Sequence, residues 1–251
     1  MKAIWKGAIS FGLITIPVKL YPAAGHQEMK YHYLHKACRT PVEYARRCPH
    51  CGVEVPWEEV MRGYDHHDHL VVLTEEELEG LAPRGEHTVE LLQCVGADEV
   101  DPLYFDKAYY LEPEAGGRKP YVLLREALAR TGKVAMGTIV IREREHLVLL
   151  RPYQGALVLH TLFYPVEVQP VAQLALPHAS PRERELKTAG ELVQKLSGGF
   201  APERFTDRYR SALMDLLERK EKWEKEERKG GSTTKPHRQG KPAPLSPEEA
   251  A

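Results

Sequence analysis

Hydrophobic and polar positions alternate near the start of the chain. The apolar residues Ile14, Ile16, Val18 and Leu20 are separated by Thr15, Pro17 and Lys19. This period of two is typical of a half-buried β-strand, so residues 1–22 are predicted to be extended. Because proline cannot donate a ladder hydrogen bond, Pro17 indicates an edge position or a break between two strands.

Similar apolar runs predict further strands at 70–73, 88–95, 109–111, 134–141, 147–150 and 156–163. The charged residues 142–146 separate two of these runs and are expected to form a hairpin tip. Short helices interrupt the pattern: Thr74 and Glu77 have capping-box spacing, and residues 120–131 carry an apolar side. Many short strands with mixed connections favour a barrel or a sandwich.

The pattern becomes helical near the C-terminus. Ser180, Pro181 and Glu183 form a helix-start signal, and the apolar spacing continues to Gly198–Gly199. A second helix carries Phe205, Tyr209, Leu213, Leu216 and Leu217 and continues into the highly charged residues 218–229. We interpret this pair as an arm that seeks an apolar partner. The alternative is a helical pair packed on its own β core.

Composition is that of an ordinary globular protein. The chain has 251 residues, of which 42% are hydrophobic and 28% charged. We predict a β core over residues 1–175 with an insertion at about 28–66, a helical arm over 176–229, and a disordered basic tail over 230–251. The uncharged run 7–18 is too short to span a bilayer and lacks a cleavage site, so a cytoplasmic protein without a membrane segment is expected.

Charge is balanced in total but uneven along the chain. The formal net charge is −1, whereas residues 30–53 carry +4, residues 73–106 carry −9 and residues 118–152 carry +5. Residues 228–241 add five bases and no acid. Such blocks can form a basic face that attracts nucleic acid, or they can be solvated loops that never cluster.

Three of the four cysteines lie close together in a pattern typical of a metal site. The segment reads His35-x2-Cys38-x9-Cys48-x2-Cys51, and these four donors suit a structural, tetrahedral Zn²⁺. Two alternatives remain: a reduced Cys48/Cys51 pair without metal, or a zinc site whose fourth ligand is His32 or His50. Cys94 lies in an apolar run and is expected to be a buried small hydrophobe.

No common catalytic motif is present in the sequence. The chain contains no GxGxxG, GxxxxGK[ST], GxSxG or HExxH. The histidines at 66, 67 and 69, together with Asp65 and Asp68, are a conceivable metal cluster, but an exposed turn is the simpler interpretation. We therefore do not expect an enzyme.

Several long motifs resemble the bacterial Ku proteins. They are residues 1–21 (MKAIWKGAISFGLITIPVKLY), 101–113 (DPLYFDKAYYLEP), 121–128 (YVLLREAL), 142–147 (REREHL), 150–152 (LRP), 191–193 (ELV) and 204–209 (RFTDRY). The resemblance covers about residues 1–229, in order and without a large gap. It implies a mainly β fold with α additions: a β-barrel core, an arch-like insertion holding the cysteines, and a C-terminal helical arm.

The resemblance also implies a function. Two copies would form a ring-shaped homodimer around double-stranded DNA ends and recruit an ATP-dependent DNA ligase for non-homologous end joining, without catalysis of their own and in association with the nucleoid. Phosphate contacts suffice for binding that ignores sequence. The expected DNA contacts are Lys30, Lys36, Arg39, Arg46, Arg47 and Arg62 in the arch and Arg142 and Arg144 on the hairpin; the expected dimer contacts are Phe205, Tyr209, Leu213 and Leu217.

Two other functions remain open at this point. The first is a zinc-ribbon DNA-binding regulator built on Cys38, Cys48 and Cys51, which would prefer one duplex sequence. The second is a metal-dependent hydrolase built on the histidines at 66–69, which would lose turnover in His67→Ala.

Overall fold

A computed structural model of the chain describes residues 1–25, 29–81, 87–142 and 144–229. The chain divides into two compact units, Met1–Ala175 and Leu176–Ala251. The predicted basic tail at 230–251 lies outside the described residues. No helix in the described ranges has both the length and the apolar character that crossing a bilayer requires.

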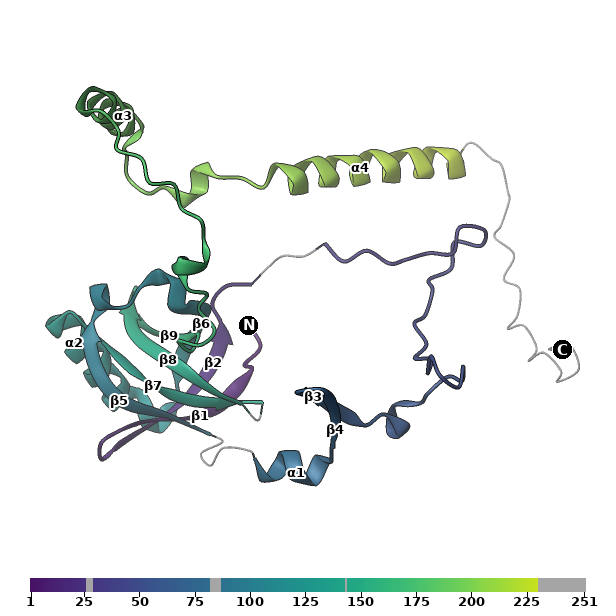
Figure 1. Cartoon of the computed structure of the whole chain (residues 1–251), viewed down its shortest axis with the longest axis horizontal. Helices are drawn as coiled ribbons and strands as arrows, with labels where there is room; N and C mark the ends of the chain where they lie inside the picture. The colour runs from purple at the N-terminus through teal and green to yellow at the C-terminus, as the bar shows by residue number, and fades with distance from the viewer. Residues whose placement is uncertain (26–28, 82–86, 143, 230–251) are drawn as a thin grey trace, which may run out of the picture. The chain divides into compact units, whose positions relative to one another are not determined.

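Seven strands of the first unit close into a barrel (Figure 1). They are β1 (Trp5–Phe11), β2 (Ile14–Pro22), β5 (Thr88–Gly96), β6 (Phe105–Pro113), β7 (Lys133–Ile141), β8 (Arg144–Tyr153) and β9 (Ala156–Leu162). The order around the barrel is β1-β2-β6-β9-β8-β7-β5. Parallel pairing of β1 with β5 closes it, and every other neighbouring pair is antiparallel. The mainly β fold with a barrel core is confirmed.

The alternating apolar positions fill the barrel interior. Ile9, Ile16, Leu20, Leu150, Leu157 and Leu159 are at most 1% exposed. The helix α2 (Arg118–Thr131) packs on this core through Tyr121, Leu124 and Leu128. The Tyr121 hydroxyl donates to the Leu111 carbonyl at 2.7 Å and accepts from the Leu157 amide at 2.7 Å. One buried side chain therefore ties α2 to both β6 and β9.

A close backbone approach explains one glycine of the barrel. A Cβ built on Gly137 would lie 1.9 Å from the Glu90 carbonyl oxygen, so no larger residue fits there without moving β5 or β7.

The β5–β7 register shifts between Leu91 and Gln93, which interrupts the inward alternation of side chains. Cys94 follows this shift and is exposed, so the expected burial of Cys94 is wrong.

The structure also decides between the two alternatives for Pro17. Pro17 lies within β2 opposite Ala8 and marks no break between strands, and its carbonyl accepts from the Glu114 amide at 2.9 Å. It is paired with β1 alone, so it occupies a local edge position. The β2–β6 ladder starts only at Val18, so the missing N–H costs no ladder bond there. The turn between the first two strands is at Gly12, whose φ is 58°.

Residues 29–81, the insertion, connect β2 to the strand β5 and have no buried side chain. They contain the hairpin β3 (Arg62–His66) and β4 (His69–Leu73) and the helix α1 (Glu75–Gly80). The capping box of α1 is confirmed: Thr74 Oγ1 accepts from the Glu77 amide at 3.2 Å, and Glu77 Oε2 accepts from the Thr74 amide at 2.8 Å. The histidines at 66–69 form the exposed turn of the hairpin, as expected.

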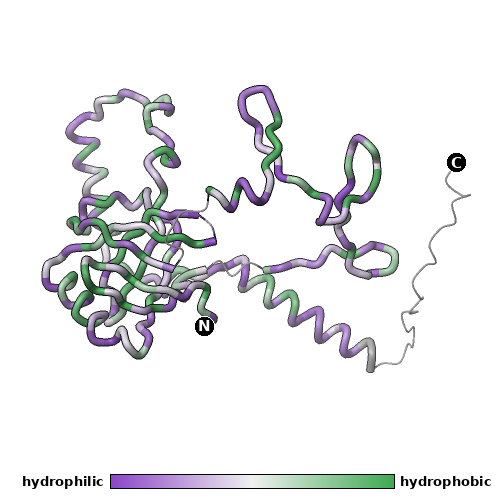
Figure 2. Tube along the Cα trace, turned by 90° about the horizontal axis from the view of Figure 1, so that it is seen from below, coloured by the Kyte–Doolittle hydropathy of each residue, from purple (hydrophilic) through white to green (hydrophobic). Residues whose placement is uncertain are grey.

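Up to residue 229, the second unit contains two α-helices, α3 (Glu183–Leu196) and α4 (Arg208–Lys229). The N-cap of α3 is Arg182, whose amide donates to Glu185 Oε2 at 2.8 Å, and not the predicted Ser180. Figure 2 shows the hydrophobic residues of α4 in its first half, whereas the half toward the C-terminus is hydrophilic. Short 3₁₀ helices complete the described elements: η1 (Trp57–Glu59), η2 (Ala97–Glu99), η3 (Pro102–Tyr104), η4 (Ala115–Gly117), η5 (Val171–Gln173) and η6 (Pro202–Arg204).

Candidate nucleic-acid interface

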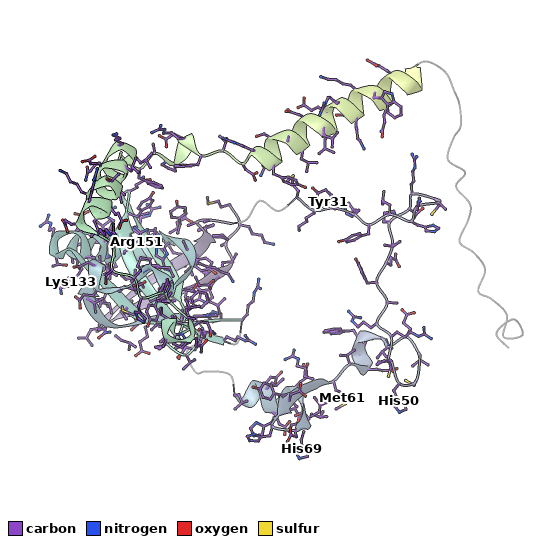
Figure 3. The ribbon with its side chains drawn as sticks, turned by 45° about the horizontal axis from the view of Figure 1, so that its top comes forward. Tyr31, His50, Met61, His69, Lys133 and Arg151 are labelled. Carbon is purple, nitrogen blue, oxygen red and sulfur yellow. The ribbon has the colours of Figure 1, made fainter. Side chains whose placement is uncertain are left out.

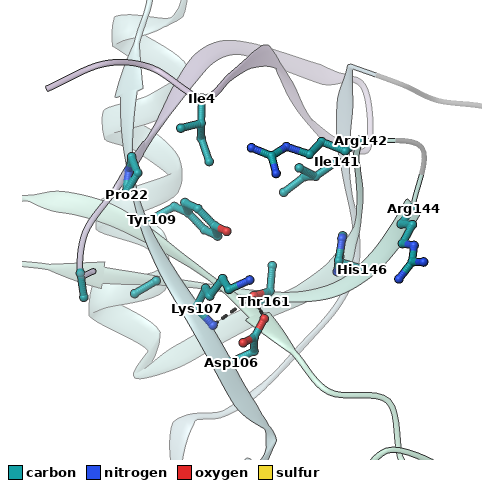
Figure 4. Close-up of a pocket in the computed structure, with 12 residues that line it drawn as sticks. Ile4, Pro22, Asp106, Lys107, Tyr109, Ile141, Arg142, Arg144, His146 and Thr161 are labelled. Atoms are coloured by element: carbon teal, nitrogen blue, oxygen red, sulfur yellow. Dashed lines mark hydrogen bonds between the residues drawn. The ribbon is translucent and has the colours of Figure 1, made fainter. Parts of the chain in front are cut away.

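A basic pocket lies beside the hairpin that joins β7 and β8 (Figure 4). Its volume is about 640 Å³, and its lining includes Lys107, Arg142, Arg144, His146 and one carboxylate, Asp106. Among the lining residues that the structure describes, three permanent positive charges stand against one negative charge, a balance that favours an anion. The lining also includes apolar side chains, which reduce solvent screening of these charges.

Backbone geometry positions the two arginines. Arg142 occupies the turn with a φ of 51°, and Arg144 begins β8 opposite Ile141. A positive φ is uncommon for a residue with a side chain, so the hairpin holds Arg142 in an unfavourable conformation. Both arginines line the pocket, and both are named as DNA contacts by the sequence analysis because they lie on a predicted charged tip.

Lys107 was missed by sequence reasoning, whereas His146 was expected on the charged tip but was not named as a contact. The β6–β9 register shifts between Phe105 and Ala108, and the Lys107 amide donates to Thr161 Oγ1 at 3.1 Å instead of to the strand ladder. The Thr161 hydroxyl in turn donates to Asp106 Oδ2 at 3.1 Å. This local irregularity brings Lys107 into the pocket, and no periodic pattern in the sequence signals it.

Tyr109 adds a neutral hydrogen-bond donor to the same pocket. Burial, and then the negative charge of Asp106, raise the pKa of this phenol, while Arg142 acts in the opposite direction. The hydroxyl therefore stays protonated at neutral pH. A protonated phenol among arginine and lysine side chains is chemically suited to a phosphate oxygen.

The most strongly perturbed histidine has a structural explanation. Burial, and then the charge of Arg151, lower the pKa of His160 to about 4. Its Nε2 accepts from Arg151 Nε at 3.0 Å, and its ring packs edge-on against Phe105 with centroids 5.0 Å apart. A perturbed pKa can mark a catalytic group, but here the imidazole is a neutral packing element that caps an arginine.

The six predicted contacts of the insertion are all exposed: Lys30, Lys36, Arg39, Arg46, Arg47 and Arg62. Three of them already make internal contacts. Arg46 lies 4.6 Å from the centroid of the Trp57 ring, Arg47 Nε donates to the Gly52 carbonyl at 2.6 Å, and Arg62 pairs with Glu75 at 3.7 Å. These bases are spread along the insertion, in contrast to the clustered arginines of the hairpin.

The predicted metal ligands form two separate pairs. His35 Nδ1 is 3.1 Å from Cys38 Sγ, and Cys48 is hydrogen-bonded to Cys51. Hydrogen bonds from Thr40, and then from His35, lower the pKa of Cys38 to about 7, while contacts with Cys51 and His50 lower the pKa of Cys48. Within the described residues no three metal-binding side chains come together. At the histidine turn, the rings of His66 and His67 have centroids 4.3 Å apart, but these residues form no group of three donors. The alternative ligands His32 and His50 belong to no such group either.

The predicted arm contacts are mostly exposed. The exposed fraction is 80% for Phe205, 67% for Tyr209 and 50% for Leu217, whereas Leu213 is half-buried. Further apolar side chains of this unit are equally open: Leu192, Val193, Leu196 and Phe200. Large apolar surface of this kind is typical of an interaction site.

Comparison with known proteins agrees with this architecture. The Ku family model, described as the Ku70/Ku80 beta-barrel domain, matches residues 10–188. Proteins called "Non-homologous end joining protein Ku" are 44% identical over 225 residues in Symbiobacterium thermophilum and 38% identical over 222 residues in Desulfitobacterium hafniense. Both alignments cover 88% of this chain, but they cover 56% of the first relative and 78% of the second. The relative of the same name from Bacillus subtilis is 39% identical over 88% of this chain and 74% of its own length. On these matches, the chain belongs to the Ku family.

Proposed function

We propose that this chain binds the ends of double-stranded DNA as a ring-shaped homodimer and recruits an ATP-dependent DNA ligase for non-homologous end joining. The observation that carries the proposal is the identity of about 40% to proteins named for this process, over most of the chain. Acting on chromosomal breaks, the protein would associate with the nucleoid.

The basic pocket supplies the chemistry that such binding needs. Lys107, Arg142 and Arg144 offer charge to phosphates, which are the same in every sequence. A closed ring admits a duplex only where the duplex has an end, so end selectivity needs no catalytic group. The acidic first turn of α1, with Glu75, Glu76 and Glu77, disfavours DNA at that point of the insertion.

The titratable groups of the barrel agree with a protein that binds DNA and partners without catalysing a reaction itself. The altered pKa values of Tyr109, Tyr121 and His160 follow from burial and from neighbouring charges or hydrogen bonds. None of these three side chains forms a nucleophile–base pair with another. We assign the chemical step of end joining to the recruited ligase.

This proposal is tested by comparing the affinity of the protein for a linear duplex with its affinity for the same duplex as a covalently closed circle. We expect a gel-shifted complex on linear DNA of any sequence, and about 10³-fold weaker binding to the circle, the usual gap between specific and non-specific complexes. Equal affinity for both forms would contradict end recognition. Preference for one of two unrelated linear sequences would instead favour the zinc-ribbon regulator.

A further inference from the structure

The basic pocket beside the β7–β8 hairpin contains a hydroxyl that the protein itself does not use. Tyr109 lines the pocket and is only 9% exposed, so its ring is part of the pocket wall. Figure 4 shows the Tyr109 hydroxyl and the Arg142 guanidinium pointing into the same space. Among the described residues this hydroxyl has no hydrogen-bond partner, although shielded tyrosine hydroxyls normally have one. A ligand that enters the pocket can supply that partner.

The groups around this hydroxyl are held in place by the fold. Thr161 is 3% exposed. Its Oγ1 accepts from the Lys107 amide and donates to Asp106 Oδ2, both at 3.1 Å. One buried side chain therefore fixes the backbone at Lys107 and the carboxylate of Asp106. The pocket is formed before a ligand enters, which lowers the entropy cost of binding.

The charge of the pocket matches a phosphate monoester better than a phosphodiester. Among the described lining residues, the three cations Lys107, Arg142 and Arg144 and the one carboxylate Asp106 leave a net charge of +2. Each phosphodiester inside a DNA strand carries one negative charge, whereas a phosphate monoester carries about −1.5 to −2 at pH 7. In DNA, a phosphate monoester occurs only at the end of a strand.

The shape of the pocket separates the same two ligands. A volume of about 640 Å³ is typical of sites for small molecules and exceeds what a phosphate alone needs. An internal phosphate of a duplex is tied to a sugar on both sides, so it can contact the exposed Arg144 but cannot approach the shielded Tyr109. A terminal nucleotide is tied on one side only and can enter the pocket.

The remaining lining residues suit the rest of a nucleotide. Ile4, Pro22 and Ile141 form an apolar part of the lining, and Ile4 is 45% exposed. Such side chains pack against the flat face of a base or against a sugar. Asp106 repels a phosphate but accepts hydrogen bonds from the amino and hydroxyl groups of a nucleotide. The pocket therefore offers separate contacts to the phosphate and to the nucleoside.

Two other groups of side chains lack this combination of charge and enclosure. The side chains that Figure 3 labels from Tyr31 to His69 belong to the insertion, where no described side chain is buried. Arg151, labelled on the barrel in the same figure, donates from Nε to His160 Nε2 at 3.0 Å and lies 5.1 Å from the centroid of the Tyr153 ring. Its guanidinium is thus engaged within the protein.

We propose that this pocket binds the phosphorylated terminal nucleotide of a DNA strand, with the Tyr109 hydroxyl donating to a phosphate oxygen and Lys107 and Arg142 neutralising the phosphate charge. The inference rests on the DNA-end binding proposed above. It adds that the protein distinguishes phosphorylated ends from dephosphorylated ends before a ligase acts. A 5′-phosphate and a 3′-phosphate offer the same chemistry, so the experiment must separate them.

The test compares one blunt duplex that carries 5′-hydroxyl, 5′-phosphate or 3′-phosphate ends, with fluorescence anisotropy as the measurement. The wild-type protein is expected to bind at least one phosphorylated form about tenfold more tightly than the hydroxyl form, the usual effect of a hydrogen bond to a charged group. Tyr109→Phe changes no charge and should remove most of this preference. A preference that persists in Tyr109→Phe, or that the wild type lacks, would overturn the inference.

Two further variants show whether the effect belongs to the pocket. Ala24 is an exposed lining residue, so Ala24→Trp fills the pocket without changing its charge and should also remove the preference. Tyr110 follows Tyr109 on β6 but lines a different surface, beside Tyr21 and Glu112, so Tyr110→Phe should keep the preference. The thermal unfolding of Tyr109→Phe should match that of the wild type, because the hydroxyl makes no bond within the described protein.

The covalently closed circle separates this inference from the proposed function. A wild-type protein that prefers linear DNA to the circle but ignores terminal phosphates would overturn the inference and leave end binding intact. Equal affinity for the circle and for linear DNA would overturn end binding and, with it, this inference.

Discussion

The double variant Arg142→Asn/Arg144→Gln is expected to bind linear duplex about 10³-fold more weakly at 0.1 M salt. In a homodimer the two substitutions remove four cations from the basic pockets. Each phosphate contact contributes about −0.9 to the slope of log K against log salt, so the slope should become shallower by about 3.6. Fluorescence anisotropy over a series of salt concentrations measures both quantities.

The variant is designed to leave the barrel intact. Asparagine tolerates the positive φ that Arg142 adopts, and position 144 is exposed. Arg130→Gln is the matched control, because Arg130 is an exposed arginine of α2 that does not line the pocket. The double variant Arg142→Lys/Arg144→Lys keeps the positive charges and should therefore retain most of the wild-type slope of log K against log salt. An Arg142→Asn/Arg144→Gln variant with wild-type affinity and slope would show that DNA does not contact this pocket.

Phe205→Asp/Leu217→Asp is expected to dissociate the homodimer in the presence of a metal chelator. Both side chains are at least half exposed in the single chain. If they are covered by the second copy, each aspartate buries an unpaired charge, which costs about 3–5 kcal/mol. Sedimentation in chelator should then give the mass of one chain for the variant and of two chains for the wild type. The chelator removes any contribution from a metal bound at the cysteines of the insertion.

An aspartate on a different surface controls for the added charge. Leu103 of η3 is 66% exposed, so Leu103→Asp should leave the dimer mass unchanged. A chain ended at residue 179 should behave like the arm variant. If the arm variant or the shortened chain remained dimeric in chelator, the copies would associate without Phe205 and Leu217.

Sequence patterns predicted the barrel well because its strands are half-buried. Inward positions such as Ile16, Val18 and Leu20 must be apolar, and this requirement is visible as a period of two. The sequence left Pro17 open between an edge position and a strand break, because the choice depends on where the β2–β6 ladder begins, which is a property of the folded barrel. The same holds for Cys94, since a register shift cannot be detected from residue types alone.

The candidate site was predictable only in part, for a related reason. Arg142 and Arg144 lie on a hairpin tip that the charge pattern marks, whereas Lys107 reaches the pocket through an irregularity of β6. In the insertion, the spacing of His35, Cys38, Cys48 and Cys51 indicated four metal donors. It did not indicate that the single chain holds these donors as two separate pairs, because that depends on the path of the chain between Cys38 and Cys48.

The most direct test of the account is to trap the protein on DNA. A linear duplex with one end blocked is incubated with the protein, the free end is then sealed by a hairpin or a bulky cap, and the salt concentration is raised to dissolve phosphate contacts. An encircling dimer should remain on the sealed duplex and leave when a nuclease reopens an end. Release from sealed and open duplexes at the same rate would contradict encirclement.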